Sequence, residues 1–319
     1  MVNVPIPCSK DKKKQRDEVN NELEEFAARY CNRFMKKYRK ISKTKNPGTK
    51  KAQQVANLSK YFQHQIVFIE YYQAFFAKRY INEMLASDSD EALIISKIEK
   101  ACGHGYTRKL QIMLKDVAES RNLNESFKSN LAKSCNIDID FSFKIIQIQA
   151  WPLEQLSSLV ILPCELERLV NKFTSFYLSE WPTKAGPRCL RWLYNLSIGE
   201  IQANCFSKSF NFRASTFQIL VLMKFNTATS FTIRQLHDAT QIDIDLLNQT
   251  IKTLLETGLL IISGEKEEAK LKLSTRVELN IGYNNPQQQV NIYTTMITEN
   301  KERTLSIRYY STGHLSIKY

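Results

Sequence analysis

The sequence predicts an α+β protein, and two changes of hydrophobic periodicity carry this prediction. Apolar residues recur every three or four positions up to about residue 135, which is the period of an amphipathic helix. From Ile137 onward they alternate with polar residues, as in a strand with one face in water. A second helical stretch then interrupts the alternation. We therefore expect a helical bundle followed by an antiparallel-rich α/β sheet domain with an inserted winged helix.

The helical bundle is expected at residues 17–136, after a basic N-terminal segment at residues 1–16. Its first helix spans about 17–39, because neither proline nor glycine interrupts this stretch. One face of that helix carries large apolar residues: Leu23, Phe26, Tyr30, Phe34 and Tyr38. A second helix at about 52–85 has an aromatic stripe too wide for one neighbour, so it should contact at least two other helices.

Shorter helices should complete the bundle. We expect Asp88 to cap one helix and Gly103 to end it. Thr107 should cap the next helix, and a further short helix is expected at 123–131. Gly103-His104-Gly105 joins two amphipathic stretches, so we interpret it as a helix stop and restart and not as a phosphate-binding loop.

The sheet domain is expected at residues 137–213 and 265–296, with a tail at 297–319. A short helix should interrupt it at 163–178. Alternating segments predict its strands at 137–145, 189–196, 200–206, 210–213, 277–283 and 290–294.

Residues 214–264 predict a winged helix, because three helical segments precede a strand. A winged helix beside basic residues is also compatible with nucleic-acid binding, which is the alternative function. The helix that would enter the groove has Lys252 as its single cation and three acidic residues: Asp243, Asp245 and Glu256. It would repel phosphates, so we expect no nucleic-acid partner.

No constellation of residues predicts catalysis, a metal or a cofactor. The chain has 9 glycines and none forms a phosphate-binding loop. Its 4 histidines lack metal-ligand spacing, and its 7 cysteines contain no pair two residues apart. We expect the cysteines to be reduced and mostly buried in apolar cores. We therefore predict a binding protein and not an enzyme.

Most of the excess positive charge lies in the first 60 residues. The net charge is +13, and residues 1–60 contain 16 Lys and Arg against 6 Asp and Glu. Such a segment attracts an anionic partner or is simply a solvated helix face. No secretory signal or membrane-spanning stretch is evident, so we expect no membrane partner and an intracellular protein, in the cytoplasm and nucleus.

Short motifs give the chain a family resemblance. They are Phe75-Phe76-Ala77-Lys78-Arg79, the stretch from Ser96 to Gly103, the stretch from Leu162 to Glu167, Phe173-Thr174-Ser175-Phe176-Tyr177, Leu190-Arg191-Trp192-Leu193-Tyr194, Gly199-Glu200 and Ser215-Thr216-Phe217-Gln218. Together with the order of the domains, they resemble the C-terminal half of cullins, particularly those closest to cullin-1. The resemblance runs from about Phe26 to Met296.

The resemblance implies a scaffold for ubiquitin-dependent protein degradation. In cullins this half holds a RING-box protein, whose N-terminal strand joins the sheet. The matching positions here lie on the strands around Trp192, Tyr194, Glu200, Ile201 and Asn204. The neighbouring strands, expected to pair with them, are supplied by Leu279, Ile281, Val290 and Ile292. A basic channel in the family attracts the acidic tail of a ubiquitin-conjugating enzyme, and the matching residues are Lys36, Lys37, Arg39, Lys40 and Lys43.

The sequence departs from the family pattern at both ends. Almost all of the adaptor-binding helical repeats are expected to be absent, because Met1 comes directly before the bundle. The modifier-accepting terminal domain is expected to be absent as well, because the match fades after Met296. We therefore expect no substrate adaptor. The chain would act as a truncated competitor of full-length cullins or, alternatively, as a minimal active scaffold.

Overall fold

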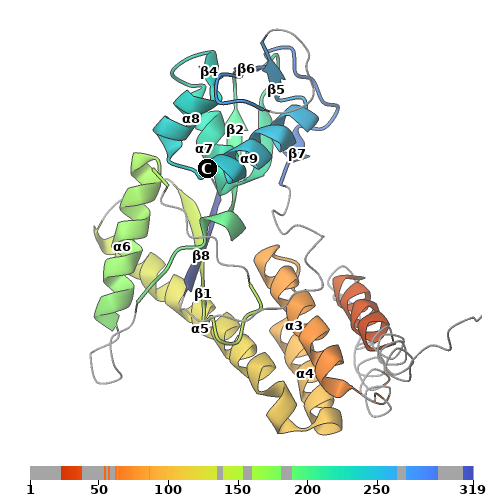
Figure 1. Ribbon diagram of the computed structural model, residues 1–319. Coiled ribbons are helices and arrows are strands. Elements are labelled where there is room, and N and C mark those ends of the chain that lie inside the picture. Colours follow the sequence, from red (N-terminus) through yellow and green to blue (C-terminus); the bar gives the residue numbers. More distant parts are fainter. Residues whose placement is uncertain are drawn as a thin grey trace, which may run out of the picture. The chain divides into compact units, whose positions relative to one another are not determined.

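The computed structural model describes residues 23–37, 54, 57, 62, 64–85, 87–134, 139–153, 160–180, 189–263, 271–293 and 312–318 (Figure 1). The chain divides into two compact units. The first takes residues up to Glu119 together with Ile146–Leu153, and the second takes Ser120–Ile145 and most of the chain after Glu154. The predicted α+β fold class is confirmed.

The first unit contains a helix at residues 23–37, α3 (Gln65–Ile81), α4 (Asp88–Cys102) and the first part of α5 (His104–Ser134). Hydrogen bonds join these helices in sequence order. Arg79 of α3 donates to Asn32 and to Glu91 of α4, and Gln111 of α5 donates to Glu99 of α4.

The helix at residues 23–37 packs through a different face from the one that the sequence predicts. Its buried residues are Glu24, Ala28, Cys31 and Met35, whereas Leu23, Phe26 and Tyr30 are exposed. Spacings of four, three and four place the buried residues on one stripe. The predicted apolar face is thus wrong, because the smaller side chains of the neighbouring stripe make the contact.

The cap of helix α4 lies one residue earlier than predicted, and the helix begins at Asp88. The cap is Ser87, whose hydroxyl accepts a hydrogen bond from the Asp90 N–H. Helix α5 is continuous from His104 to Ser134, so the two short helices expected there are one. Thr107 lies within its first turn and donates to the Gly103 carbonyl instead of capping the helix.

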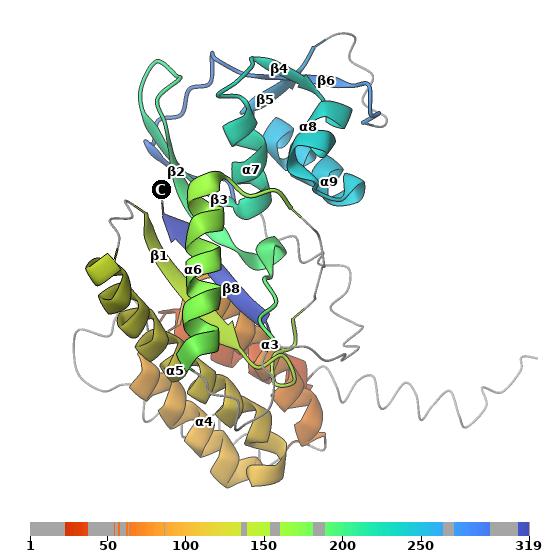
Figure 2. The ribbon, with the colours of Figure 1, turned by 90° about the vertical axis from the view of Figure 1, so that its left-hand side faces the viewer.

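The second unit contains a five-stranded sheet with the order β1-β8-β2-β3-β7. Figure 2 labels β1, β8, β2 and β3, and Figure 1 labels β7. Its strands are β1 (Asp140–Ile146), β2 (Ile198–Ala203), β3 (Phe210–Ser215), β7 (Gln289–Asn291) and β8 (Thr312–Lys318). The strands β2 and β3 form an antiparallel hairpin, while β7 runs parallel to β3 and β8 parallel to β2.

Helix α6 (Cys164–Glu180) and β1 share an aromatic core with the last turns of α5. The Phe143 ring of β1 stacks on Phe173 of α6 with centroids 4.0 Å apart, and Phe127 of α5 meets the same Phe173 ring edge-on at 5.1 Å. These contacts fix α6 against one end of the sheet.

A second set of elements follows β3: α7 (Thr216–Lys224), β4 (Ser230–Thr232), α8 (Ile233–Thr240), α9 (Ile244–Glu256), β5 (Leu260–Ile262) and β6 (Arg276–Leu279). Capping boxes at Ser215 and Thr232 start α7 and α8. The three short strands form a separate sheet with the order β4-β6-β5.

The sheet assignment of β6 corrects the sequence prediction. The segment 277–283 was expected to pair with 189–206, but Val277 lies opposite Phe231 of β4 and Ile262 of β5. Only the segment around Val290 joins the larger sheet, where it pairs with Phe212 among the described residues. Alternation of polar and apolar residues specifies the buried face of a strand and not its neighbour, so both assignments satisfied the pattern.

Candidate partner-docking sheet

Strand β2 lies at the centre of the candidate docking sheet. It pairs with β3 from Ile198 to Ala203, and with β8 from Ile198 to Glu200. Ile198 and Gly199 are buried, whereas Glu200 and Ile201 are half-buried. The strand is therefore anchored at its first two residues and becomes more accessible toward its end.

Four of the predicted partner-binding residues lie on this sheet or next to it. Glu200 and Ile201 are on β2, and Val290 is on β7. Ile292 directly follows β7 and is buried, and its carbonyl accepts a hydrogen bond from Gln218 Nε2 at 2.9 Å. The sheet therefore brings these residues into one structural element, although β3 separates β2 from β7.

Asn204 lies in the turn between β2 and β3. It is exposed, and its Oδ1 accepts a hydrogen bond from the Ser209 hydroxyl at 2.8 Å. Gln202 Nε2 in turn donates to the Ser209 oxygen at 3.0 Å. These bonds hold the hairpin turn, so Asn204 has a structural role in addition to the predicted partner contact.

Trp192 and Tyr194 do not lie on a regular strand, which corrects the strand expected at 189–196. The chain forms a 3-10 turn at Tyr194–Leu196 instead. The Trp192 ring meets Phe143 edge-on at 5.6 Å and so joins the aromatic core beside α6. Tyr194 packs against the core around α7, and its burial, together with the Glu167 charge, raises its pKa to about 12.

Leu279 and Ile281 lie apart from the larger sheet. Leu279 is the last residue of β6 and pairs with Leu260 of the smaller sheet. Ile281 follows it and is 65% exposed. The prediction that both residues supply strands next to β2 is therefore wrong, because β6 completes the three-stranded sheet.

The predicted basic site falls only partly within the described residues. Lys36 and Lys37 are exposed at the end of the helix at 23–37. Partial burial lowers the pKa of Lys36, and the positive charges of Arg79 and Lys78 lower it further. Arg39, Lys40 and Lys43 lie outside the described residues, so the clustering of all five cations stays a prediction.

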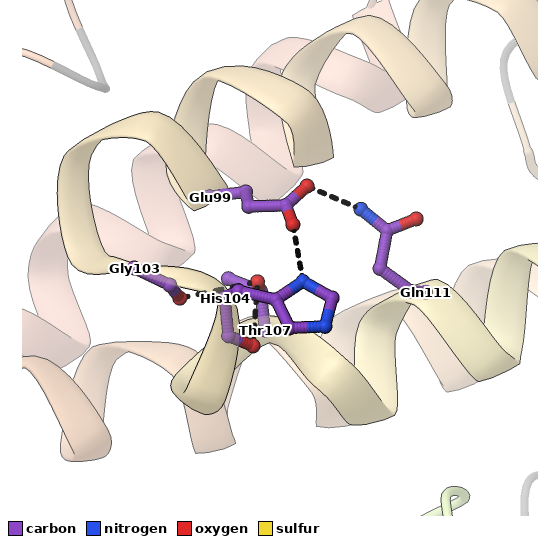
Figure 3. Close-up of polar contacts among 5 residues, drawn as sticks. All are labelled: Glu99, Gly103, His104, Thr107 and Gln111. Carbon is purple, nitrogen blue, oxygen red and sulfur yellow. Dashed lines mark hydrogen bonds and ion pairs between the residues drawn. The ribbon is translucent and has the colours of Figure 1, made fainter.

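The turn at Gly103 is a helix stop and restart, as the sequence predicts. Gly103 ends α4 with φ at 95°, and α5 starts at the next residue. Glu99 Oε1 lies 2.6 Å from His104 Nδ1, and Gln111 Nε2 donates to Glu99 Oε2 at 2.7 Å (Figure 3). These side chains fasten the end of α4 to the start of α5.

The other described residues with metal-binding or nucleophilic side chains do not form a metal site or a catalytic site. Among the described residues, no group of three or more His, Cys, Asp and Glu could hold a metal ion. Cys31 and Cys102 are buried, and burial raises the pKa of Cys31 to about 12. Three other described cysteines are exposed, so the expectation of cysteines mostly buried in apolar cores is wrong for them: Cys164, Cys189 and Cys205.

The sequence reasoning missed one polar site, the buried ion pair of Arg79 and Glu91. Arg79 Nε and Nη2 donate to the two Glu91 oxygens at 3.1 and 2.8 Å, and the side chains are 0% and 1% exposed. Burial disfavours the Arg79 charge, but Glu91 and Tyr72 outweigh this effect and raise the Arg79 pKa. The signal was a lone arginine within the aromatic stripe of the second predicted helix.

Two family models match successive parts of the chain. The Cullin alpha solenoid domain matches residues 9–124, and the Cullin alpha+beta domain matches residues 145–283. The second match contains α6, the β2–β3 hairpin and the smaller sheet. A helical segment joined to this α+β domain defines the class: the chain belongs to the cullin family.

The curated relatives include several proteins named cullin-1. The chain is 28% identical over 292 residues to Cullin-1 of Dictyostelium discoideum, an alignment covering 89% of this chain and 37% of that protein. Cullin-1 of Caenorhabditis elegans is 29% identical, with coverage of 84% and 34%. Cullin-1 of Schizosaccharomyces pombe is 30% identical, with coverage of 77% and 33%. The chain thus spans about a third of the length of these relatives.

Proposed function

We propose that this chain is a non-catalytic scaffold that binds a RING-box protein through the five-stranded sheet and, through that protein, recruits a ubiquitin-conjugating enzyme. The observation that carries the proposal is the match of the Cullin alpha+beta domain to residues 145–283, which include β2 and β3. An extended partner segment on the β8 side of β2 would gain backbone hydrogen bonds toward Ala203, beyond Glu200, where the pairing with described β8 residues stops.

The test is a binding measurement with a purified RING-box protein and the full chain. Replacing Ile201 with Glu puts a charge on the half-buried end of β2 and should weaken binding at least tenfold. Ile261→Glu is the matched control, because this isoleucine is 45% exposed on the smaller sheet and its replacement should leave the affinity unchanged.

Folding of both variants is checked by circular dichroism and by hydrogen exchange of α6. Tyr194 is unsuitable for this test, because it packs in the core and a charge there would unfold the domain. No association of the unmodified chain, or equal affinities of two folded variants, would refute the proposal.

The basic residues supply the second part of the proposal. Lys36 and Lys37, with the neighbouring cations, attract the acidic tail of a ubiquitin-conjugating enzyme and thereby raise the association rate. Lys36→Glu with Lys37→Glu should lower the association rate at low salt and have less effect at high salt. An unchanged rate at low salt would leave only a solvated helix face.

In cells, the protein is proposed to act in the cytoplasm and nucleus as a competitor of full-length cullins. A chain that occupies the RING-box protein lowers the amount available to other scaffolds by mass action. Overexpression should therefore make cullin substrates accumulate. Faster turnover of those substrates, with RING-box binding confirmed, would instead favour a minimal active scaffold.

A further inference from the structure

Strand β8 occupies an interior position of the sheet. It lies between β1 and β2, and its residues Ser316, Ile317 and Lys318 run parallel to β2 opposite Ile198, Gly199 and Glu200. Figure 2 shows the blue β8 ribbon beside β1. Without β8, the facing edges of β1 and β2 would each lack a neighbour, leaving a slot one strand wide.

The pairing of β8 covers only part of β2. The hairpin partner β3 pairs with β2 from Ile198 to Ala203, whereas the β8 pairing with described residues stops at Glu200. An inserted segment that continued the ladder to Ala203 would add backbone hydrogen bonds that the described residues of β8 do not make. A partner strand that paired as far as Ala203 would therefore have a longer ladder than the described residues of β8 at the same position.

We propose that β8 is a placeholder: it fills the slot between β1 and β2 that an extended segment of a partner protein takes, and the partner binds by displacing it. The inference rests on the proposed function, since the partner is the RING-box protein. It adds that the unbound chain is autoinhibited by its own residues 312–318.

The placeholder has a measurable energetic consequence. Only molecules from which β8 has left can accept the partner, so the apparent dissociation constant is the intrinsic one divided by the open fraction. If about one molecule in ten is open, the observed affinity is reduced about tenfold. Loss of the β8 pairing should raise the observed affinity for the partner by the same factor.

The test uses two double variants of the full chain. Ser316→Pro with Ile317→Pro removes two backbone N–H groups from β8, whereas Ser316→Ala with Ile317→Ala keeps them. The proline variant should bind the RING-box protein on the order of tenfold more tightly, and the alanine control should stay within about threefold of the unmodified chain.

Hydrogen exchange of the unmodified chain provides the second measurement. Residues 312–318 should be protected in the free chain and lose protection when the RING-box protein is added, while β2 stays protected. A fluorescent peptide with the sequence of residues 312–318 should also bind the proline variant better than the unmodified chain. This peptide needs no RING-box protein.

The outcomes separate the inference from the proposed function. Equal RING-box affinities of the proline variant and the unmodified chain, or protection of 312–318 that survives saturation with the partner, would overturn the placeholder and leave RING-box binding intact. If no chain bound the RING-box protein, the proposed function would fail. In that case, equal binding of the 312–318 peptide by the proline variant and by the unmodified chain would also refute the proposed slot between β1 and β2.

Discussion

Removing the Glu91 carboxylate should lower the free energy of unfolding of the helical unit by more than any surface substitution on the same helix. Glu91→Ala leaves the Arg79 guanidinium buried without a carboxylate partner, beside the Asn32 oxygen 3.1 Å away and the Tyr72 side chain. Breaking a buried pair in this way costs about 3–5 kcal/mol. Since a tenfold change corresponds to about 1.4 kcal/mol, protection of α3 and α4 amides should fall by about two to three and a half powers of ten.

Native-state hydrogen exchange measures this change, and two further variants define its origin. Glu99→Ala on the same helix removes the pair with His104, which is 75% exposed, and the hydrogen bond from Gln111, and should cost no more than about 1–2 kcal/mol. The double replacement Arg79→Met with Glu91→Leu should recover most of the loss, because neither charge is then left buried. A loss below about 1 kcal/mol for Glu91→Ala would refute the reasoning.

Three further predictions concern packing, pH and thiol reactivity. Phe173→Ala should destabilise the second unit by about 3–5 kcal/mol in urea unfolding, since this fully buried ring contacts Phe127 and Phe143; a loss under about 1 kcal/mol would contradict the described aromatic core. Burial raises the pKa of Asp116. The contribution of this carboxyl group to the free energy of unfolding is therefore present at low pH and is lost as the pH rises through the folded-state pKa. Asp116→Asn should flatten this pH dependence, which urea unfolding at a series of acidic pH values measures. At pH 8 a maleimide should label the exposed thiols of the described residues within minutes and leave Cys31 and Cys102 unmodified until the chain unfolds; the described exposed thiols are Cys164, Cys189 and Cys205. Mass spectrometry checks this, and rapid labelling of Cys31 would contradict its burial.

Elements whose hydrophobic period reflects a single buried face could be predicted from the sequence. Helix α6 and the β2–β3 hairpin fall within or close to their expected ranges, because each has one clear apolar face. The helix at 23–37 carries two apolar stripes, and its larger residues form the exposed one. Periodicity alone cannot decide which stripe meets a neighbour.

The predicted site was recovered less completely than the fold. Glu200 and Ile201 lie on β2 as expected, but Leu279 belongs to the smaller sheet because strand pairing depends on distant residues. Tyr194 alternates like a strand residue and yet lies in a 3-10 turn, where tertiary packing overrides local preference. Strand β8 was not predicted, since its residues were assigned to a tail.

The sheet order also has a consequence for biosynthesis. Strand β1 is made at residues 140–146, but its neighbour β8 lies at residues 312–318. At a translation rate of roughly 5–20 residues per second, the edge of β1 waits on the order of ten to thirty seconds for that neighbour. Pairing between such distant segments is also slow to form. Throughout this interval the nascent sheet offers an unpaired edge, so chaperones or a partner strand can reach β1 before the chain supplies β8.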